Sequence, residues 1–87
     1  MIEVIYAPKF IRMYKELPSS LKDEVKDKIF LFRNKENHQK LKVHKLHGDM
    51  KNFFAFSVNY KIRIVFEYES KKTVNLLYVG GHDEVYE

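Results

Sequence analysis

The second half of the chain contains three consecutive segments with the alternation of β-strands, separated by short turns. The segments span residues 53–58, 62–68 and 73–79, and the turns between them are marked by Asn59-Tyr60 and Glu69-Ser70-Lys71-Lys72. Apolar residues at a period of two are typical of strands, and turns this short are typical of hairpins. The pattern predicts an antiparallel meander, one face of which must be covered by other elements.

The first half of the chain supplies elements that can cover this sheet. Residues 2–6 alternate at a period of two, which predicts a first strand. Pro8 suits the first turn of a helix, and Pro18 ends it. The apolar positions of this short helix follow at spacings of four and three and are Phe10, Tyr14 and Leu17.

A second helix is predicted from Ser19 or Ser20, either of which can cap its N-terminus. Asp23 and Glu24 would lie in its first turn, where the helix dipole favours carboxylates. Its apolar stripe consists of Leu21, Val25, Ile29 and Phe32. The element order is strand, helix, helix, strand, strand, strand. It predicts a single α+β domain over residues 1–87, in which a two-helix hairpin packs on one face of a small antiparallel sheet.

Alternation along residues 62–68 assigns the two faces of that sheet. Ile62, Ile64, Phe66 and Tyr68 share one face, which we expect to meet the helices. Arg63 lies on the other face, where it could bind a ligand or pair with Glu67. Residues 73–79 are apolar on both faces, with Val74, Leu76 and Tyr78 on one and Leu77 and Val79 on the other. An apolar open face predicts a partner that covers it.

The net charge of +4 is concentrated in residues 33–51, which carry six basic and two acidic residues, whereas the rest of the chain carries ten of each. We expect an extended loop here, anchored by Leu41, Val43 and Leu46. A local basic excess is typical of a surface that binds a polyanion, although a solvated lysine-rich loop has the same composition.

Several classes of protein are disfavoured by the composition. Cysteine is absent, which excludes thiol catalysis, disulfides and cysteine-ligated zinc. The first residues include the acidic Glu3 and no long apolar run, so we expect no signal peptide, no membrane span and a cytoplasmic location. His44 and His47 stand at an i, i+3 spacing, but no carboxylate is suitably spaced to complete a metal site. We therefore expect no metal and no cofactor.

Three motifs resemble those of the RelE/ParE toxin superfamily, particularly its YafQ-like branch. Residues 44–48 form a His-x-Leu-x-Gly loop, and residues 60–64 read Tyr-x-x-Arg-Ile. Residues 80–86 read Gly-x-His-x-x-x-Tyr. The motifs occur in the family's order and span nearly the whole chain. The resemblance implies a toxin of a type II toxin–antitoxin system that binds the ribosomal A site and cleaves mRNA there without metal. It also implies a small antitoxin partner, with a monomeric toxin when free and a hetero-oligomer with the antitoxin.

The resemblance assigns roles to individual residues. His82 matches the family's catalytic histidine and Tyr86 its aromatic partner. His44 matches the loop histidine of the YafQ-like branch, and Arg63 matches the strand arginine of RelE. The chain departs from the YafQ-like pattern at two positions, since a second histidine and an aspartate of that branch are replaced by Ser57 and Lys61.

Metal-free cleavage of RNA explains why these residue types are needed. A base must deprotonate the 2′-hydroxyl, a cation must stabilise the phosphorane, and an acid must protonate the leaving 5′-oxygen. Histidine suits both proton roles, and arginine offers a planar fork to phosphate. Tyr86 could stack on a base or orient the substrate. We expect RNA or ribosome contacts from Lys42, Lys45, Lys51, Lys61 and His47, with His47 and His38 facing solvent.

Two other functions use the same fold. A ParE-like protein inhibits DNA gyrase without cleaving RNA, and an inactive homologue would only bind an antitoxin. The presence of both His82 and His44 favours the mRNA endonuclease, because gyrase inhibitors of the family generally lack these acid and base groups.

Overall fold

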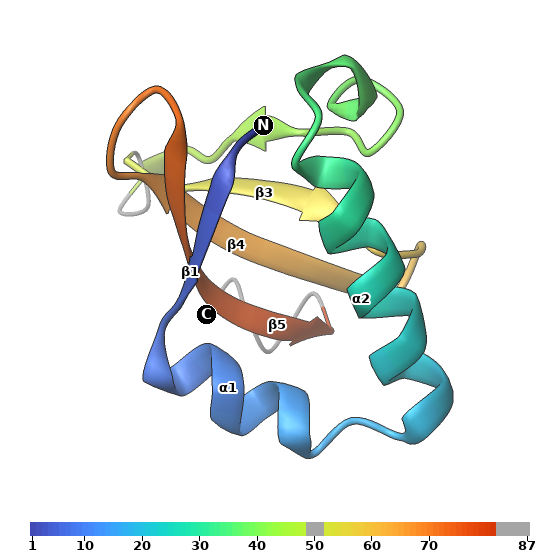
Figure 1. The fold of residues 1–87 in the computed structure, drawn as a ribbon. Coiled ribbons are helices and arrows are strands. Elements are labelled where there is room, and N and C mark those ends of the chain that lie inside the picture. The colour runs from blue at the N-terminus through green and yellow to red at the C-terminus, as the bar shows by residue number, and fades with distance from the viewer. Residues whose placement is uncertain (49–51, 82–87) are drawn as a thin grey trace.

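The computed structural model describes residues 1–48 and 52–81 and shows an α+β fold, as predicted (Figure 1). Two helices and a five-stranded mixed sheet make up the described part. None of its helices is long and apolar enough to cross a membrane. The elements in chain order are β1 (Glu3–Tyr6), α1 (Pro8–Lys15), α2 (Ser19–Phe32), a short 3-10 helix (Lys35–Asn37), β2 (His44–Lys45), β3 (Phe54–Ser57), β4 (Ile62–Tyr68) and β5 (Thr73–Gly81).

The strand order is β1-β5-β4-β3-β2, and the predicted meander β3-β4-β5 forms its antiparallel centre. The sheet is nevertheless mixed, because β1 pairs in parallel with β5. β1 and β5 are far apart in the sequence, so no hairpin turn forces them to be antiparallel. Backbone bonds from the Glu3 amide to the Lys72 carbonyl (2.7 Å) and from the Ala7 amide to the Leu76 carbonyl (2.9 Å) extend this pairing.

The basic segment contains an edge strand where an extended loop is predicted. β2 pairs with β3 through His44 opposite Ala55 and Lys45 opposite Phe54. The three predicted anchors are confirmed, because Leu41 is buried and Val43 and Leu46 are partly buried against apolar clusters. The histidine loop is therefore held in register with the sheet.

The start of α2 differs from the prediction by one residue. Pro18, rather than Ser19 or Ser20, occupies the N-cap, with φ −58° and ψ 152°. The Lys22 amide donates to the Pro18 carbonyl (3.0 Å), which closes the first turn. This earlier start removes Asp23 and Glu24 from the first turn, which contains no acidic residue. Proline suits a helix start because its fixed φ is compatible with the N-terminal residues.

The main core lies between α2 and the sheet (Figure 1), and Phe32 is completely buried in it. Its ring stacks on Phe56 at 4.4 Å and meets Phe66 edge-on at 4.8 Å between centroids. Ile62, Ile64 and Phe66 belong to this core, which confirms the predicted face of β4, whereas Tyr68 is 37% exposed. Aromatic pairs in these geometries add about 0.5–1.5 kcal/mol each beyond their burial.

A β-bulge in β5 changes which residues face the core. Phe66 pairs with Leu76, but Val65 pairs with Tyr78, so Leu77 is an extra residue in β5. The predicted grouping of Tyr78 with Leu76 is therefore wrong beyond this point. Val79 joins the main core, and Tyr78 and Leu77 join a second cluster around Val65. An inserted residue reverses the alternation, and sequence parity alone does not reveal it.

Candidate functional site

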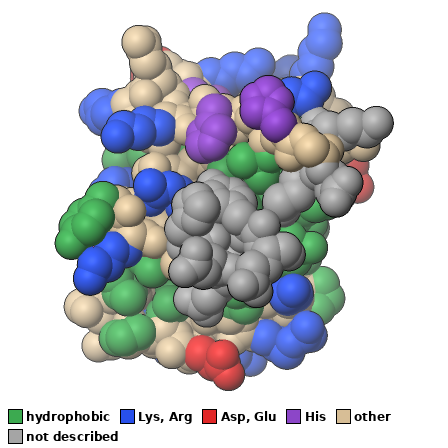
Figure 2. Space-filling model, turned by 180° about the vertical axis from the view of Figure 1, so that it is seen from behind, with side chains coloured by type: hydrophobic (Ala, Val, Ile, Leu, Met, Phe, Trp, Pro, Cys, Tyr) green, Lys and Arg blue, Asp and Glu red, His purple; other side chains and the backbone are tan. Residues whose placement is uncertain are grey.

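The side of the sheet opposite to α2 carries the two predicted catalytic residues that the structure describes, His44 and Arg63. His44 is opposite Ala55, Ala55 is opposite Val65, and Ser57 is opposite Arg63. Side chains of directly paired residues share a face, so His44, Ser57 and Arg63 project from the same side. Figure 2 shows this side, with histidine side chains in its upper part and lysine and arginine side chains beside them and along the edges of the view. The register separates the Cα atoms of His44 and Arg63 by about 12 Å.

This face is less open than the sequence predicts. Ala55 and Val65 are completely buried in the second apolar cluster. The partly buried residues around them are Met13, Leu46, Phe53, Leu77 and Tyr78. Met13 also contacts the main core, so α1 contributes apolar contacts to both clusters. The polar groups therefore surround an apolar floor.

The guanidinium of Arg63 is anchored by only one of its nitrogens. Nη1 donates to the carbonyls of Asn59 (2.6 Å) and Ile62 (3.3 Å). No ion pair with Glu67 forms within residues 1–48 and 52–81, so that alternative is not supported. Within this range Nε and Nη2 have no hydrogen-bond acceptor, and together they form the edge that binds a phosphate in two parallel bonds.

His44 is held in one tautomer by its own backbone. Its Nδ1 lies 2.8 Å from the carbonyl oxygen of Lys42. A carbonyl oxygen can only accept, so Nδ1 carries the proton and Nε2 of the neutral ring carries the lone pair. The side chain is exposed, so Nε2 can accept a proton from a substrate.

The carbonyl that orients His44 belongs to a residue with an unusual backbone conformation. Lys42 has φ +60°, and it is the only non-glycine residue with positive φ among those described. This left-handed region costs about 1–2 kcal/mol for a residue with a Cβ. Strained residues of this kind cluster at functional sites, where the surrounding structure holds them in place.

A basic pocket of about 280 Å³ lies beside this face, between α2, residues 40–42 and the β3–β4 turn. Its cationic lining residues are Lys28, Lys40, Lys42 and Arg63, and no acidic residue is among the described residues that line it. Ser57 and Tyr60 also line it. Because Arg63 belongs to both, the pocket adjoins the sheet face that carries His44 and Arg63.

The other predicted residues are less closely associated with this geometry. Lys45, His47 and Lys61 are exposed, and the Lys61 ammonium lies 5.8 Å from the centre of the Tyr60 ring. In residues 1–48 and 52–81 no three histidine, aspartate or glutamate side chains are arranged to hold a metal. Three predicted site residues lie outside the described residues, namely Lys51, His82 and Tyr86.

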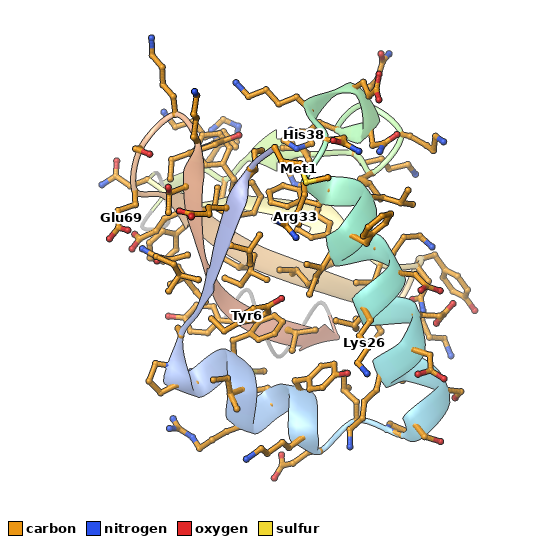
Figure 3. All side chains as sticks on the ribbon, viewed as in Figure 1. Met1, Tyr6, Lys26, Arg33, His38 and Glu69 are labelled. Carbon is orange, nitrogen blue, oxygen red and sulfur yellow. The ribbon has the colours of Figure 1, made fainter. Side chains whose placement is uncertain are left out.

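His38 does not face solvent as predicted. Its ring stacks on Phe32 at 4.6 Å and lies 7° from parallel, and its Nε2 is 2.7 Å from the Phe32 carbonyl (Figure 3). It covers the end of the core and has a structural role. His38 follows Phe32 by six residues, after the end of α2. Neither helix nor strand periodicity predicts a contact between two residues at this spacing.

Two lysines and one asparagine of the site are not identified by the motifs. Lys28 lies on α2, where it resembles any solvated helical lysine, and Lys40 lies in the basic segment without a motif. Asn59 is marked in the sequence only as a turn residue. Its carbonyl accepts from Arg63, its Oδ1 accepts from the Lys61 and Ile62 amides (both 2.8 Å), and its Nδ2 donates to Glu24 (2.9 Å).

No protein-family model and no curated protein sequence matches the chain. Solved structures match it in fold. YafQ from E. coli superposes with a TM-score of 0.81 at 14% identity, covering 100% of both chains. The E. coli DinJ-YafQ toxin-antitoxin complex matches with a TM-score of 0.77 at 17% identity, covering 99% of this chain and 98% of the other.

The toxin-antitoxin complex RelBE2 from Mycobacterium tuberculosis also matches, with a TM-score of 0.74 at 17% identity over 93% of this chain and 98% of the other. Identities this low establish the arrangement of elements but not the chemistry. The matches nevertheless cover nearly every element of the chain, including the mixed sheet. The chain therefore has the RelE-like fold that these toxins share, as its motifs predict.

Proposed function

We propose that this chain is a toxin of the RelE/ParE superfamily, in the YafQ-like branch, that cleaves mRNA on the ribosome. The proposal rests on the hydrogen bonds that orient the side chains of His44 and Arg63. Each is anchored by a backbone carbonyl at one nitrogen, and each has its reactive atoms without a described partner on one face of the sheet. Such an arrangement is preorganised for a proton transfer beside a phosphate.

His44 acts as the general base in this proposal. Nε2 takes the proton of a ribose 2′-hydroxyl, and Nδ1 remains bonded to the Lys42 carbonyl. The positive charge that develops on the ring is stabilised by that carbonyl. The 2′-oxygen then attacks the adjacent phosphorus, which gains an additional negative charge.

Arg63 stabilises the charged phosphorane, and His82 completes the reaction. Nε and Nη2 of Arg63 can donate to two equatorial oxygens, because only Nη1 is bonded to the Asn59 and Ile62 carbonyls. The bond from phosphorus to the 5′-oxygen breaks, and His82 donates the proton that this oxygen needs. The products are a 2′,3′-cyclic phosphate and a 5′-hydroxyl. Water is therefore not a reactant, and the proposed mechanism assigns no role to a metal ion.

The ribosome and an antitoxin are the partners in this proposal. The A-site target comes from the motif resemblance, and the local basic excess of residues 33–51 fits a surface that contacts RNA. Two structures with the same fold are toxin-antitoxin complexes. An antitoxin for this chain would cover the sheet face that carries His44 and Arg63 and so block RNA access.

Inducible expression without an antitoxin tests the proposal. We expect growth to stop because translation stops, so puromycin labelling should fall before DNA synthesis does. Transcripts should show new ends on translating ribosomes, and His82→Ala and His44→Ala should remove them. Loss of DNA synthesis with translation intact would instead identify a gyrase inhibitor. Normal growth with a folded, expressed chain would favour an inactive antitoxin binder.

A further inference from the structure

The basic pocket beside Arg63 has a size and charge that select a small anionic group. Its volume of about 280 Å³ lies just below the range of about 300–1,000 Å³ typical of sites for drug-sized ligands. Three lysines converge on it from separate parts of the chain, Lys28 from α2 and Lys40 and Lys42 from the segment before β2. Convergence of cations without an acidic neighbour among the described lining residues favours one bound phosphate over a set of surface ion pairs.

The lysines are positioned by the backbone around the pocket. Lys28 is partly buried on α2, whereas Lys26, two residues earlier on α2, lines a separate apolar groove between α1 and α2 (Figure 3). The Leu41 carbonyl accepts from the Ser57 amide (2.9 Å), which fixes the segment bearing Lys40 and Lys42 against β3. The pocket is therefore built from connected elements.

Tyr60 adds an aromatic surface at the rim of the same pocket. It is 83% exposed, the most exposed of the large apolar side chains in the described residues. The Lys61 ammonium 5.8 Å from its ring centre adds charge to this rim. Lysines that hold a phosphate beside an exposed aromatic ring are the combination used to bind single-stranded nucleic acid.

We infer that this pocket is a subsite for the nucleotide next to the cleavage point, with its phosphate held by Lys28, Lys40 and Lys42 and its base stacked on Tyr60. The inference rests on the proposed function, since it takes Arg63 to bind the scissile phosphate. Arg63 lines the pocket and also lies on the sheet face that carries His44. One phosphate of an RNA strand can therefore bind at Arg63 while the neighbouring phosphate binds in the pocket. The subsite fixes the strand's register relative to His44, and it tolerates any base because every base can stack.

Binding of a short, unstructured RNA at low ionic strength tests the inference without requiring cleavage. Fluorescence anisotropy would be measured for Lys28→Gln and Lys40→Gln and for the matched controls Lys26→Gln and Lys71→Gln, which remove the same charge outside both the pocket and the basic segment. Each pocket variant should lower the slope of log affinity against log salt by about 0.7, the contribution of one phosphate contact on a single strand. Lys28→Arg should retain the affinity.

The stacking contact has its own test. Tyr60→Ala should weaken binding about tenfold and Tyr60→Phe much less, since stacking needs the ring and not the hydroxyl. An RNA with abasic sites at successive positions should identify one position at which Tyr60→Ala has no further effect. Equal effects at every position would contradict a defined base subsite.

Failure of the subsite and failure of the proposed function give different results. If wild type cleaves mRNA on ribosomes but the pocket variants bind RNA like their controls, the inference is wrong and the proposed function stands. If the pocket variants lose RNA binding but no cleavage occurs, the subsite stands and the nuclease proposal fails. If the pocket variants retain RNA binding and lose only binding to an acidic protein partner, the pocket binds protein and the inference is wrong.

Discussion

His44 and Arg63 are oriented by main-chain carbonyl oxygens, not by carboxylates. The Lys42 carbonyl fixes the tautomer of His44, and the Asn59 and Ile62 carbonyls hold one nitrogen of Arg63. A neutral acceptor orients Arg63 without neutralising its positive charge, and it orients the neutral His44 ring without placing a negative charge beside a bound phosphate. The orientation of these two side chains thus depends on the local backbone conformation.

Variants of Arg63 should distinguish the effect of its positive charge from the effect of its paired Nε and Nη2 donors. Arg63→Ala should lower the cleavage rate by about 10² to 10³, in the range of other lost transition-state donors. Arg63→Lys should restore only part of this rate, because an ammonium cannot donate from the Nε and Nη2 edge. Arg12→Ala, an exposed arginine on α1, is the matched control. Full activity of Arg63→Ala in single-turnover cleavage would exclude the assigned role.

Lys42→Gly tests whether the positive φ of Lys42 lowers the free energy of unfolding. Glycine adopts φ +60° without the Cβ penalty, so the variant should be at least as stable as wild type in urea unfolding, with a gain of up to about 1 kcal/mol. Lys40→Gly removes a neighbouring lysine without a positive φ and should lose about 0.4–1 kcal/mol. Equal destabilisation by both changes would show that Lys42 is not strained.

The β3–β4 turn is the element that connects α2 to the sheet face carrying His44 and Arg63. Asn59 bonds with its side chain to the Lys61 and Ile62 amides and to the Glu24 carboxylate, and with its carbonyl to Arg63. Displacement of this turn should therefore change both the start of β4 at Ile62 and the position of the Asn59 carbonyl that binds Arg63. The Asn59 side chain has no substitute here, because it must accept from the turn and donate to α2 at once.

A double-mutant cycle measures this connection. Asn59→Asp retains the two acceptor bonds but places a carboxylate against Glu24, so it should lower the free energy of unfolding by about 1–3 kcal/mol. Glu24→Gln supplies a donor to that carboxylate and should recover most of the loss in the double variant. Additive losses in chemical denaturation would show that the two side chains do not interact.

Element types were predictable from sequence where one periodic pattern dominates. The alternation in residues 62–68 correctly predicted that Ile62, Ile64 and Phe66 face the core, and Pro8 correctly predicted the start of α1. The predicted end of that helix at Pro18 was wrong, because α1 ends at Lys15 and Leu17 lies beyond it. The bulge at Leu77 was not predictable, because it depends on the register of β5 against β4. β2 was missed for a similar reason, since two residues are too short for a periodic pattern.

The candidate site was predictable only where a motif contains it. His44 and Arg63 were predicted from their motifs and Lys42 from the basic segment, whereas the places of Lys28, Lys40 and Asn59 depend on tertiary contacts between distant segments. The count of charges in residues 33–51 did not distinguish basic side chains with a structural role from those available to a ligand. Arg33 belongs to the basic segment, but its Nε donates to the Ile2 carbonyl (3.0 Å) and ties the N-terminal strand to the end of α2.

At the scale of the whole molecule, charge and apolar surface are arranged around one face. The second apolar cluster forms the floor of that face, and the basic pocket lies at its edge. A partner that covers both must combine apolar contacts with negative charge. This is the combination expected of an antitoxin that imitates the charge of RNA.

We predict that the antitoxin presents an acidic, partly helical segment to this face. The product of an adjacent small open reading frame should bind this protein, and its association rate should fall steeply with salt. Lys28→Gln and Lys40→Gln should weaken the complex more than Lys26→Gln does. The absence of any affinity between the two proteins in calorimetry would contradict the predicted partner.

The most direct test of the account is single-turnover cleavage of mRNA on stalled ribosomes, with ribosome binding measured separately. His44→Ala removes the proposed base and should slow cleavage by about 10² to 10⁴, the usual contribution of one proton transfer, while ribosome binding changes little. His47→Ala changes an exposed histidine in the same loop motif, so it should at most weaken ribosome binding and leave the cleavage rate of the bound complex near that of the wild type. Wild-type cleavage by His44→Ala, or no cleavage by the wild type itself, would contradict the account.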